Sequence, residues 1–480
     1  MYLGIDLGTS GLRALLTDDT GRPVASAEAQ YDVQTPHPGW SEQDPSHWIT
    51  ALDQAMAQLQ GSPGYSDIRG IAVAGHMHGA VLLDSADQVL RPCILWNDTR
   101  SAAEAAELDA TAQVRDLSGN IVFPGFTAPK LLWVQRHEPK IFARTAKVLL
   151  PAAYLNLHLA GRYVADMSDS AGTSWLDVGA RDWSDHLLEA GQMRRDQMPD
   201  LVEGSSAAGR LRPELASRWG LAGPVTIAGG AGDNAAAACG TGVMTAGQGF
   251  VSLGTSGVVL TARDGFHPDP ATAVHTFCHA IPERWYQMGV MLSATDCLNW
   301  LGRITGRSPA DLTAGLGDQL RPPGEVTFMP YLSGERTPHN SANLRGGFDG
   351  LSIATTAEDL ARAVMEGVSY GLRDCLEALR KTGAQLDSCL VIGGGSKSAY
   401  WVKLLATILD LPLQLPKDGE FGAALGAARL ARLAVTGEDP AEVLTAPEHA
   451  MTVPPDPQLR DSYDTGYAAF RKRGAELTLR

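Results

Sequence analysis

A short polar turn occurs twice in this chain, about half its length apart. Residues 6–12 read Asp-Leu-Gly-Thr-Ser-Gly-Leu, and residues 252–258 read Ser-Leu-Gly-Thr-Ser-Gly-Val. Each copy lies between two apolar stretches, which predicts a strand, a tight turn and a second strand. Backbone N–H groups and hydroxyls of small residues in such a turn can bind phosphate. One copy alone would most simply be a plain hairpin, whereas two copies favour a phosphate-binding hairpin in each half of the chain.

Asp6 comes at the end of the first predicted strand, directly before the first turn. A carboxylate at that place can hold Mg²⁺ beside a polyphosphate, directly or through water. The second copy has Ser252 instead, which suits a single metal site built by one half. An exposed acid in a turn is the structural alternative.

Asp233 follows a predicted strand and a glycine turn, at the start of an alanine-rich helix. Residues 230–235 also satisfy Gly-x-Gly-x-x-Ala, the pattern of a dinucleotide site, which needs an acid about 20 residues further on to bind the ribose. Because no Asp or Glu occurs between Asp233 and Asp264, that site is disfavoured. The glycines would instead let a substrate hydroxyl approach Asp233, which could act as a general base, although a helix cap is a compatible structural explanation.

A third glycine loop, residues 393–398, follows a predicted buried strand over residues 388–392. It lacks the Gly-Lys pair of a Walker loop, and the protein-kinase motifs are absent as well. A glycine turn at a strand end can let adenine or ribose lie against the backbone. A loop without a ligand is the alternative.

The composition of the chain argues against several classes of protein. The 480 residues carry a formal charge of −15, which disfavours a general nucleic-acid surface but leaves phosphate binding by backbone N–H groups open. The six cysteines form no C-x-x-C pair, which indicates reduced thiols in a cytoplasmic protein. Since no run of about 18 uncharged apolar residues occurs, we expect no spanning helix and no membrane partner.

Strands and helices are predicted to alternate, which indicates an α/β protein. After the first hairpin, Asp44 and Pro45 signal the cap and first turn of a helix. Residues 355–358, Thr-Thr-Ala-Glu, predict a capping box that opens a long helix, and residues 457–480 predict a helical tail. We place one lobe, with the first hairpin and the candidate base, at residues 1–245, and a second lobe at residues 246–480.

Two long segments resemble the signatures of the FGGY family of carbohydrate kinases. They are residues 125–137 and residues 346–351 with 359–366. The resemblance extends over nearly the whole chain and implies two ribonuclease-H-like, actin-like ATPase domains that flank a central cleft. Residues 75–80, 94–100 and 331–339 are most similar to the bacterial members that phosphorylate xylulose, except that His76 stands where that pattern has Gln.

The resemblance implies ATP-dependent phosphorylation of D-xylulose to D-xylulose 5-phosphate, with ATP as co-substrate and Mg²⁺ as cofactor. It makes residues 1–245 the sugar-binding lobe and residues 246–480 the nucleotide-binding lobe. It implies Asp233 as the base, Asp6 as the residue near Mg²⁺, and Met77, His78 and Asn234 at the sugar. The implied nucleotide-binding residues are Gly8, Thr9, Ser10, Arg13, Gly254, Thr255, Gly394, Gly395 and Ser398.

Two other functions stay open at this point. A sister kinase could act on ribulose, gluconate or glycerol, because function depends on the sugar pocket and not on the fold. A nucleotide-switched binding protein of the same fold would need a partner-binding module, for which the sequence has no repeat or extra domain. The sequence leaves the oligomeric state open, a homodimer included. We expect the two lobes to close on the sugar through a hinge between about residues 240 and 252.

Overall fold

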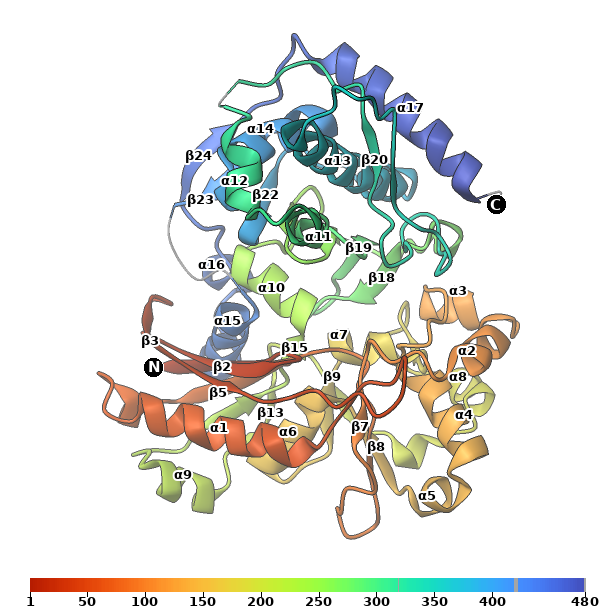
Figure 1. Ribbon diagram of the computed structural model, residues 1–480. Coiled ribbons are helices and arrows are strands. Elements are labelled where there is room, and N and C mark those ends of the chain that lie inside the picture. Colours follow the sequence, from red (N-terminus) through yellow and green to blue (C-terminus); the bar gives the residue numbers. More distant parts are fainter. Residues whose placement is uncertain (318, 418–421, 479–480) are drawn as a thin grey trace.

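The computed structural model describes residues 1–317, 319–417 and 422–478. Its elements form two stacked α/β halves, each built on a seven-stranded sheet (Figure 1). This arrangement confirms the predicted fold class.

The first sheet opens the chain and has the order β13-β14-β5-β1-β2-β3, with β15 also paired to β5. Strands β1 and β2 form the predicted first hairpin, and β1, β14 and β15 all run parallel to β5. The strands of this sheet are β1 (Tyr2–Leu7), β2 (Gly11–Thr17), β3 (Pro23–Gln30), β5 (Gly70–Gly75), β13 (Ala207–Arg210), β14 (Thr226–Ala228) and β15 (Ala231–Gly232).

The second sheet repeats the motif in the order β18-β19-β17-β16-β22-β23-β24. Its hairpin β16–β17 is antiparallel and β16 runs parallel to β22, as β1 does to β5. The predicted hairpin in each half is therefore confirmed. The strands are β16 (Gly249–Leu253), β17 (Gly257–Arg263), β18 (His275–Cys278), β19 (Trp285–Met291), β22 (Cys389–Ile392), β23 (Leu413–Pro416) and β24 (His449–Val453).

Two helix starts test the predicted caps. Helix α1 (Pro45–Leu59) begins as predicted, and the Asp44 carboxylate accepts a hydrogen bond of 2.9 Å from the Ser46 amide. Helix α13 (Ala357–Lys381) has its capping box at Thr356 and Asp359, so the box predicted from Thr355 was wrong by one residue. The cause is local, because the Thr355 hydroxyl accepts from the Ser352 amide instead.

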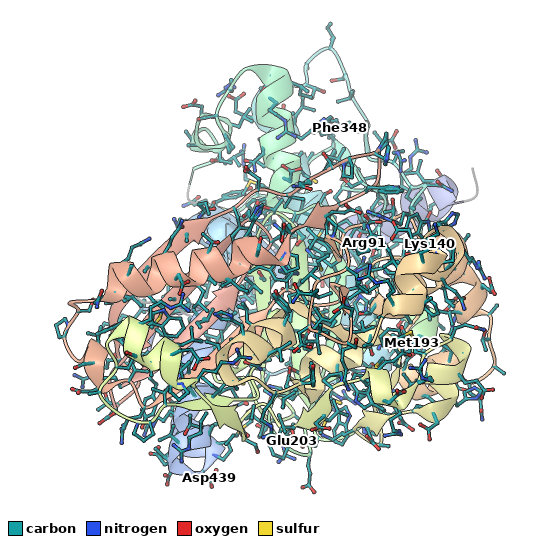
Figure 2. The ribbon with its side chains drawn as sticks, turned by 90° about the horizontal axis from the view of Figure 1, so that it is seen from below. Arg91, Lys140, Met193, Glu203, Phe348 and Asp439 are labelled. Carbon is teal, nitrogen blue, oxygen red and sulfur yellow. The ribbon has the colours of Figure 1, made fainter. Side chains whose placement is uncertain are left out.

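Two small-residue helices join the halves. Helix α10 (Asp233–Thr241) packs along α15 (Ala423–Thr436), and α15 in turn covers β1 and β5 of the first sheet. The approach is so close that a Cβ on Gly426 would overlap the Ala236 carbonyl, and one on Gly4 would overlap that of Ala424. In Figure 2, Asp439, which follows α15, and Glu203 of the first half both lie toward the bottom of the view, whereas Phe348 lies in its upper part. A helix late in the sequence thus completes the first half.

The other elements surround these sheets. The shorter strands are β4 (Glu42–Gln43), β6 (Val81–Leu83), β7 (Cys93–Ile94), β8 (Lys147–Leu149), β9 (Val164–Asp166), β10 (Leu176–Asp177), β11 (Asp182–Trp183), β12 (Asp200–Val202), β20 (Thr327–Met329) and β21 (Gly347–Asp349). The other helices of the first half are α2 (Ala102–Asp109), α3 (Val114–Ser118), α4 (Thr127–His137), α5 (Pro139–Arg144), α6 (Pro151–Ala160), α7 (Met167–Ser170), α8 (Asp185–Ala190) and α9 (Pro213–Trp219). Those of the second half are α11 (Thr295–Thr305), α12 (Pro309–Ala314), α14 (Ala399–Leu409), α16 (Pro440–Val443) and α17 (Arg460–Thr478). Helix α17 confirms a helical tail from Arg460 to Thr478, and residues 479–480 of the prediction lie outside the described residues.

Two observations bear on the predicted environment of the chain. Within the described residues, no helix is both long enough and apolar enough to cross a membrane. All six cysteines are buried free thiols.

Candidate active site

Three neighbouring parallel strands of the first sheet end at the same edge. In the strand register, Leu7 at the end of β1 lies beside Gly75 of β5, and Gly75 lies beside Gly232 of β15. Asp6 therefore comes just before this edge, and Met77, His78 and Asp233 come just after it. Ligands of α/β proteins commonly bind at the carboxyl ends of parallel strands. The structure thus brings together the residues predicted for the base, the metal and the sugar.

Asp233 is the first residue of α10, and Gly232 rather than Asp233 is the helix cap. One carboxylate oxygen of Asp233 accepts hydrogen bonds from the amide (2.7 Å) and the side-chain nitrogen (2.9 Å) of Asn234. Burial raises the pKa of Asp233 to about 6, although the two hydrogen bonds from Asn234 act in the opposite direction. A carboxylate with a pKa near the working pH is suited to accept a proton.

Asp6 lies near Asp233 and opposite Arg13, its cross-strand partner on β2. Burial and, to a smaller extent, the Asp233 carboxylate together raise the pKa of Asp6 to about 7, although the Arg13 guanidinium acts in the opposite direction. A divalent cation beside these two carboxylates would relieve their repulsion. No cluster of three or more acidic, His or Cys ligands occurs in the described part of the chain. A magnesium ion here would therefore use one or two carboxylates, with phosphate oxygens and water as its other ligands.

His78 follows β5 in a left-handed backbone conformation, with a φ of 71°. Its carbonyl accepts hydrogen bonds from the Lys130 ammonium (2.8 Å) and the Thr127 hydroxyl (3.1 Å), both on α4. Its ring stacks on Phe126 with the centroids 4.5 Å apart. Helix α4 belongs to the segment predicted as a family signature. That segment therefore holds the backbone of the loop that carries His78.

The protonation of the His78 ring is set by its surroundings. Burial lowers the pKa of His78 to about 3, so the ring is neutral at physiological pH. Nδ1 lies 2.7 Å from the Gly172 carbonyl, which can only accept, so Nδ1 carries the proton. Nε2 is then an acceptor, which can receive a hydrogen bond from a hydroxyl group.

Met77 and His76 differ in their surroundings. Met77 is buried, and its sulfur lies 3.8 Å from the hydroxyl of Tyr286, on β19 of the second half. His76 donates its backbone N–H to the Leu7 carbonyl, and its buried ring makes an edge contact with Trp48. His76 therefore packs in the core of the first half, beneath the loop that carries Met77.

The first hairpin turn is held by donors from its own half. The Gly8 carbonyl accepts from the Tyr31 hydroxyl (2.6 Å), and the Thr9 carbonyl accepts from the Gln43 side chain (2.6 Å). The Ser10 carbonyl accepts from the Tyr31 amide. These bonds direct the carbonyl oxygens of the turn into the protein, so they do not face an incoming anion.

The second hairpin turn repeats this arrangement. The Gly254 carbonyl accepts from the amide (2.9 Å) and the hydroxyl (2.8 Å) of Thr295, and the Thr255 carbonyl accepts from the Ala294 amide (2.7 Å). The donors come from the start of α11. Both predicted phosphate turns therefore have their carbonyl oxygens bound by neighbouring residues.

The third glycine loop lies beside the second turn, because β22 runs parallel to β16. Gly393 has a φ of 91°, and a Cβ there would lie 2.8 Å from the Leu253 carbonyl carbon. This close approach places Gly394 and Gly395 next to the turn that contains Gly254. The Ser398 hydroxyl accepts from the Trp401 amide (3.3 Å) and caps α14, which by itself accounts for a serine at this position.

The segment around α7 was not predicted as part of the site. Ser168 accepts a hydrogen bond of 3.1 Å from the Gly232 amide, and Gly172 binds His78. Both carboxylate oxygens of Asp169 are buried without a hydrogen-bond partner in the described residues, and burial, Asp166 and Asp233 raise its pKa well above the usual range. The run of short polar residues at 166, 168, 169 and 170 was the signal available in the sequence.

Arg336 was also missed as a neighbour of the site. Its guanidinium lies over the Phe123 ring at 4.6 Å and 3.4 Å from Nε2 of His275. Its charge helps to lower the pKa of His78. The second half therefore supplies a cation near His78.

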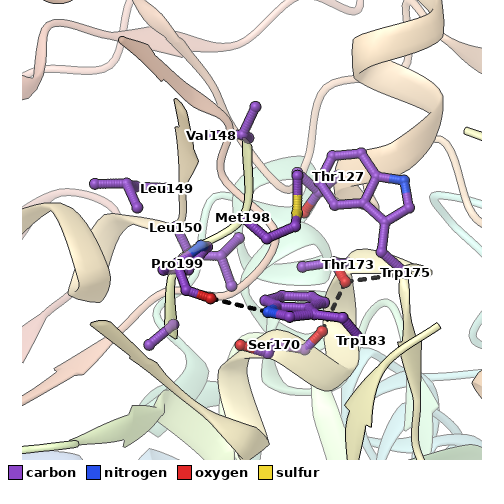
Figure 3. A pocket seen from close by; sticks show the side chains of 11 residues that line it. Thr127, Val148, Leu149, Leu150, Ser170, Thr173, Trp175, Trp183, Met198 and Pro199 are labelled. Atoms are coloured by element: carbon purple, nitrogen blue, oxygen red, sulfur yellow. Dashed lines mark hydrogen bonds between the residues drawn. The ribbon is translucent and has the colours of Figure 1, made fainter. Parts of the chain in front are cut away.

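A small cavity lies behind the α7 segment (Figure 3). It is lined mainly by apolar side chains, together with Ser170, Thr173 and the two indoles of Trp175 and Trp183. Its volume of about 10 Å³ is that of a single water molecule. It is too small for a sugar.

Comparison with known proteins assigns both halves to one family. Residues 1–240 match the N-terminal domain of the FGGY family of carbohydrate kinases, and residues 249–435 match its C-terminal domain. The chain is 48% identical to the xylulose kinase of Escherichia coli K12 over 480 residues, 99% of each chain. A crystal structure described as a "xyloylose kinase" from Brucella ovis is 54% identical with a TM-score of 0.97 over 99% of each chain. The gluconate kinase of Lactobacillus acidophilus is 25% identical with a TM-score of 0.92, over 99% of this chain and 98% of that one.

Proposed function

Because this chain belongs to the FGGY family of carbohydrate kinases, we propose that it transfers the γ-phosphoryl group of ATP to D-xylulose, giving ADP and D-xylulose 5-phosphate. The relatives named xylulose kinase support this substrate. The observation that carries the proposal is the convergence of Asp6, His78 and Asp233 at the ends of three adjacent strands.

Asp233 is the proposed base. The sugar hydroxyl oxygen attacks the γ-phosphorus, the bond to the β–γ bridging oxygen breaks, and the hydroxyl proton passes to the Asp233 carboxylate. Phosphoryl transfer usually has a loose transition state, so the main task of the base is to orient the hydroxyl. The two hydrogen bonds from Asn234 fix one oxygen of Asp233 and leave the other for the substrate.

Asp6 is the proposed residue for Mg²⁺. Bound there, the ion would neutralise charge on the transferring phosphate. Its nearness to Asp233 and its raised pKa support this role, because a cation would hold both carboxylates in the ionised form that the reaction needs.

The proposed sugar residues belong to the first half, whereas the proposed nucleotide residues come from the hairpin turns of both sheets and from the glycine loop of the second. His78 offers Nε2 as an acceptor, and Met77 and Asn234 complete the proposed sugar contacts. The proposed phosphate contacts are Gly8, Thr9, Ser10 and Arg13 in the first turn and Gly254 and Thr255 in the second, with Gly394, Gly395 and Ser398 at the nucleoside. We also place the enzyme in the cytoplasm, because its six cysteines are free thiols.

A coupled assay of ADP release tests the proposal. We expect the highest kcat/KM with D-xylulose among D-xylulose, D-ribulose, D-gluconate and glycerol, each with saturating MgATP. Gluconate is included because a gluconate kinase shares this fold. A higher kcat/KM with any other member of the panel would reassign the substrate, and no sugar-stimulated turnover would contradict kinase function.

A further inference from the structure

The segment from Asp166 to Gly172 connects the two loops that carry the proposed base and the proposed sugar histidine. The Ser168 hydroxyl bonds to the Gly232 amide, and the Gly172 carbonyl bonds to the His78 ring. Ser168, Asp166 and Gly232 are all buried. The base and the sugar loop are therefore held by one short piece of chain.

The direction of the hydrogen bonds around Ser168 is fixed. The Asp166 carboxylate accepts from the Ser168 hydroxyl and also from the Ser168 amide (2.6 Å), and it accepts more weakly from the Asp169 amide. Because the hydroxyl hydrogen points to Asp166, a lone pair of the oxygen faces the Gly232 N–H, 3.1 Å away. A buried carboxylate thus orients a hydroxyl, and that hydroxyl orients the backbone.

The backbone that is oriented is the one that carries Asp233. Gly232 caps α10 and Asp233 follows it directly. The Gly232 N–H points into the protein, and glycine has no side chain to restrict its dihedral angles. Without the Ser168 oxygen, this buried N–H would lose its acceptor, and the Ala231–Gly232 peptide, which leads into Asp233, would be held only by the pairing of β15 with β5.

We propose that Ser168 is a positioning residue for Asp233, and that the chain Asp166 carboxylate, Ser168 hydroxyl and Gly232 N–H sets the place of the base. The inference rests on the proposed role of Asp233. Ser168 does not touch the reacting atoms, so its effect is on kcat through geometry and not on ligand affinity.

Steady-state kinetics of Ser168→Ala test this proposal. We expect kcat to fall by about tenfold or more, because a displacement of about 1 Å can cost about a hundredfold in rate. The KM values for xylulose and ATP should stay within about twofold of the parent. Ser168→Thr keeps a hydroxyl and should recover a large part of the lost kcat. An unchanged kcat in Ser168→Ala would overturn the proposal.

Ser170→Ala is the matched control. Ser170 lies on the same segment and is fully buried, but its hydroxyl has no hydrogen-bond partner in the described residues and it lines the small cavity of Figure 3. Its loss should leave kcat within about twofold. An equal loss of kcat in both serine variants would mean that the segment acts only through stability. If Ser168→Ala does not fold, Ser168→Cys keeps the volume with a weaker acceptor and takes its place in every comparison.

A double variant separates this inference from the proposed function. If Ser168 acts through Asp233, the variant with both Ser168→Ala and Asp233→Asn should be no slower than Asp233→Asn alone. If the loss of kcat in the double variant equals the product of the two single losses, Ser168 does not act through Asp233, although Asp233 can still be the base. If Asp233→Asn alone keeps the parental rate, the proposed function fails, whatever Ser168 does.

Discussion

Asp233 combines three properties that a general base needs. It lies at the end of a parallel strand, it has a pKa raised to about 6, and Asn234 orients one of its oxygens. Asp233→Asn keeps the shape and removes the base. We expect kcat to fall by about 10² to 10⁴, with a much smaller change in the Kd for xylulose measured by calorimetry. A variant that keeps more than about half of the parental rate would rule out this role.

The same residue should lower the stability of the fold. Its pKa is about 6 in the folded chain, above the ordinary value of 3.8, so the folded state binds more protons than the unfolded state between these pH values. Stability must then fall as the pH rises through this window, and the penalty is complete above it.

Asp233→Asn removes that penalty. In buffer with a metal chelator, we expect the variant to be more stable than the parent by about 1 to 3 kcal/mol at pH 8, with a gain that shrinks toward pH 4.5. Thermal unfolding at both pH values measures it. Equal melting temperatures of parent and variant at pH 8 would show that burial of Asp233 costs nothing.

Some residues of the site could be predicted from their neighbours in the sequence, and others could not. Asp6 and Asp233 could be found because each stands next to a strand end and a glycine turn, and these signals are local. Ser168 could not, because its partner Gly232 is 64 residues away and no spacing rule connects them. Arg336 was hidden for the same reason, since it reaches its neighbours from the other half of the chain.

At the scale of the elements, the two hairpins were predicted from apolar stretches on either side of a polar turn, and α1 was predicted from its capping residues. The start of α13 did not, because the Thr355 hydroxyl and the Thr356 hydroxyl compete for the same role and the neighbouring Ser352 decides between them. The close packing of α10 on α15 could not be predicted either. Alanine and glycine are frequent in both helices, but their sequences do not say which partner each helix meets.

Gly426→Ala tests how tightly these two helices control the site. The added methyl group would collide with the backbone carbonyl of Ala236 in α10, so the helix must shift, and Asp233 at its start must shift with it. We expect a loss of stability of about 1 to 3 kcal/mol, together with a larger loss of kcat than of substrate affinity.

Gly223→Ala is the control, because an added Cβ there meets no atom within 4 Å. It should change neither the melting temperature nor kcat measurably. Full activity and stability in Gly426→Ala would mean that α10 can move without consequence for the base.

At the scale of the whole molecule, the proposed sugar groups and most of the proposed nucleotide groups lie on different sheets. We expect the two halves to close on their ligands, which would bring the hydroxyl to about 3 Å from the γ-phosphate and exclude water. The connection between α10 and β16 contains Gly242 and Gly247, both with positive φ, within the predicted hinge.

Small-angle scattering measures this closure. We expect xylulose to reduce the radius of gyration, and ATP alone to reduce it less. The parent without ligands and the parent with a sugar that is not phosphorylated provide the controls. A radius of gyration that neither ligand changes, alone or together, would contradict closure while leaving the kinase proposal intact.

The packing of α15 on the first sheet has a consequence for how the chain is made. The last strand of the first sheet along the sequence, β15, ends at Gly232, but the helix that covers β1 and β5 is α15, which ends only at Thr436. During synthesis, the apolar face of that sheet therefore stays uncovered until roughly two hundred more residues have been added. In that time it can bind chaperones or aggregate. A fragment that stops at residue 245 should be insoluble when expressed alone, and residues 246–480 supplied in trans should rescue it. A gene for this enzyme cannot be divided at its midpoint without separating a sheet from its cover.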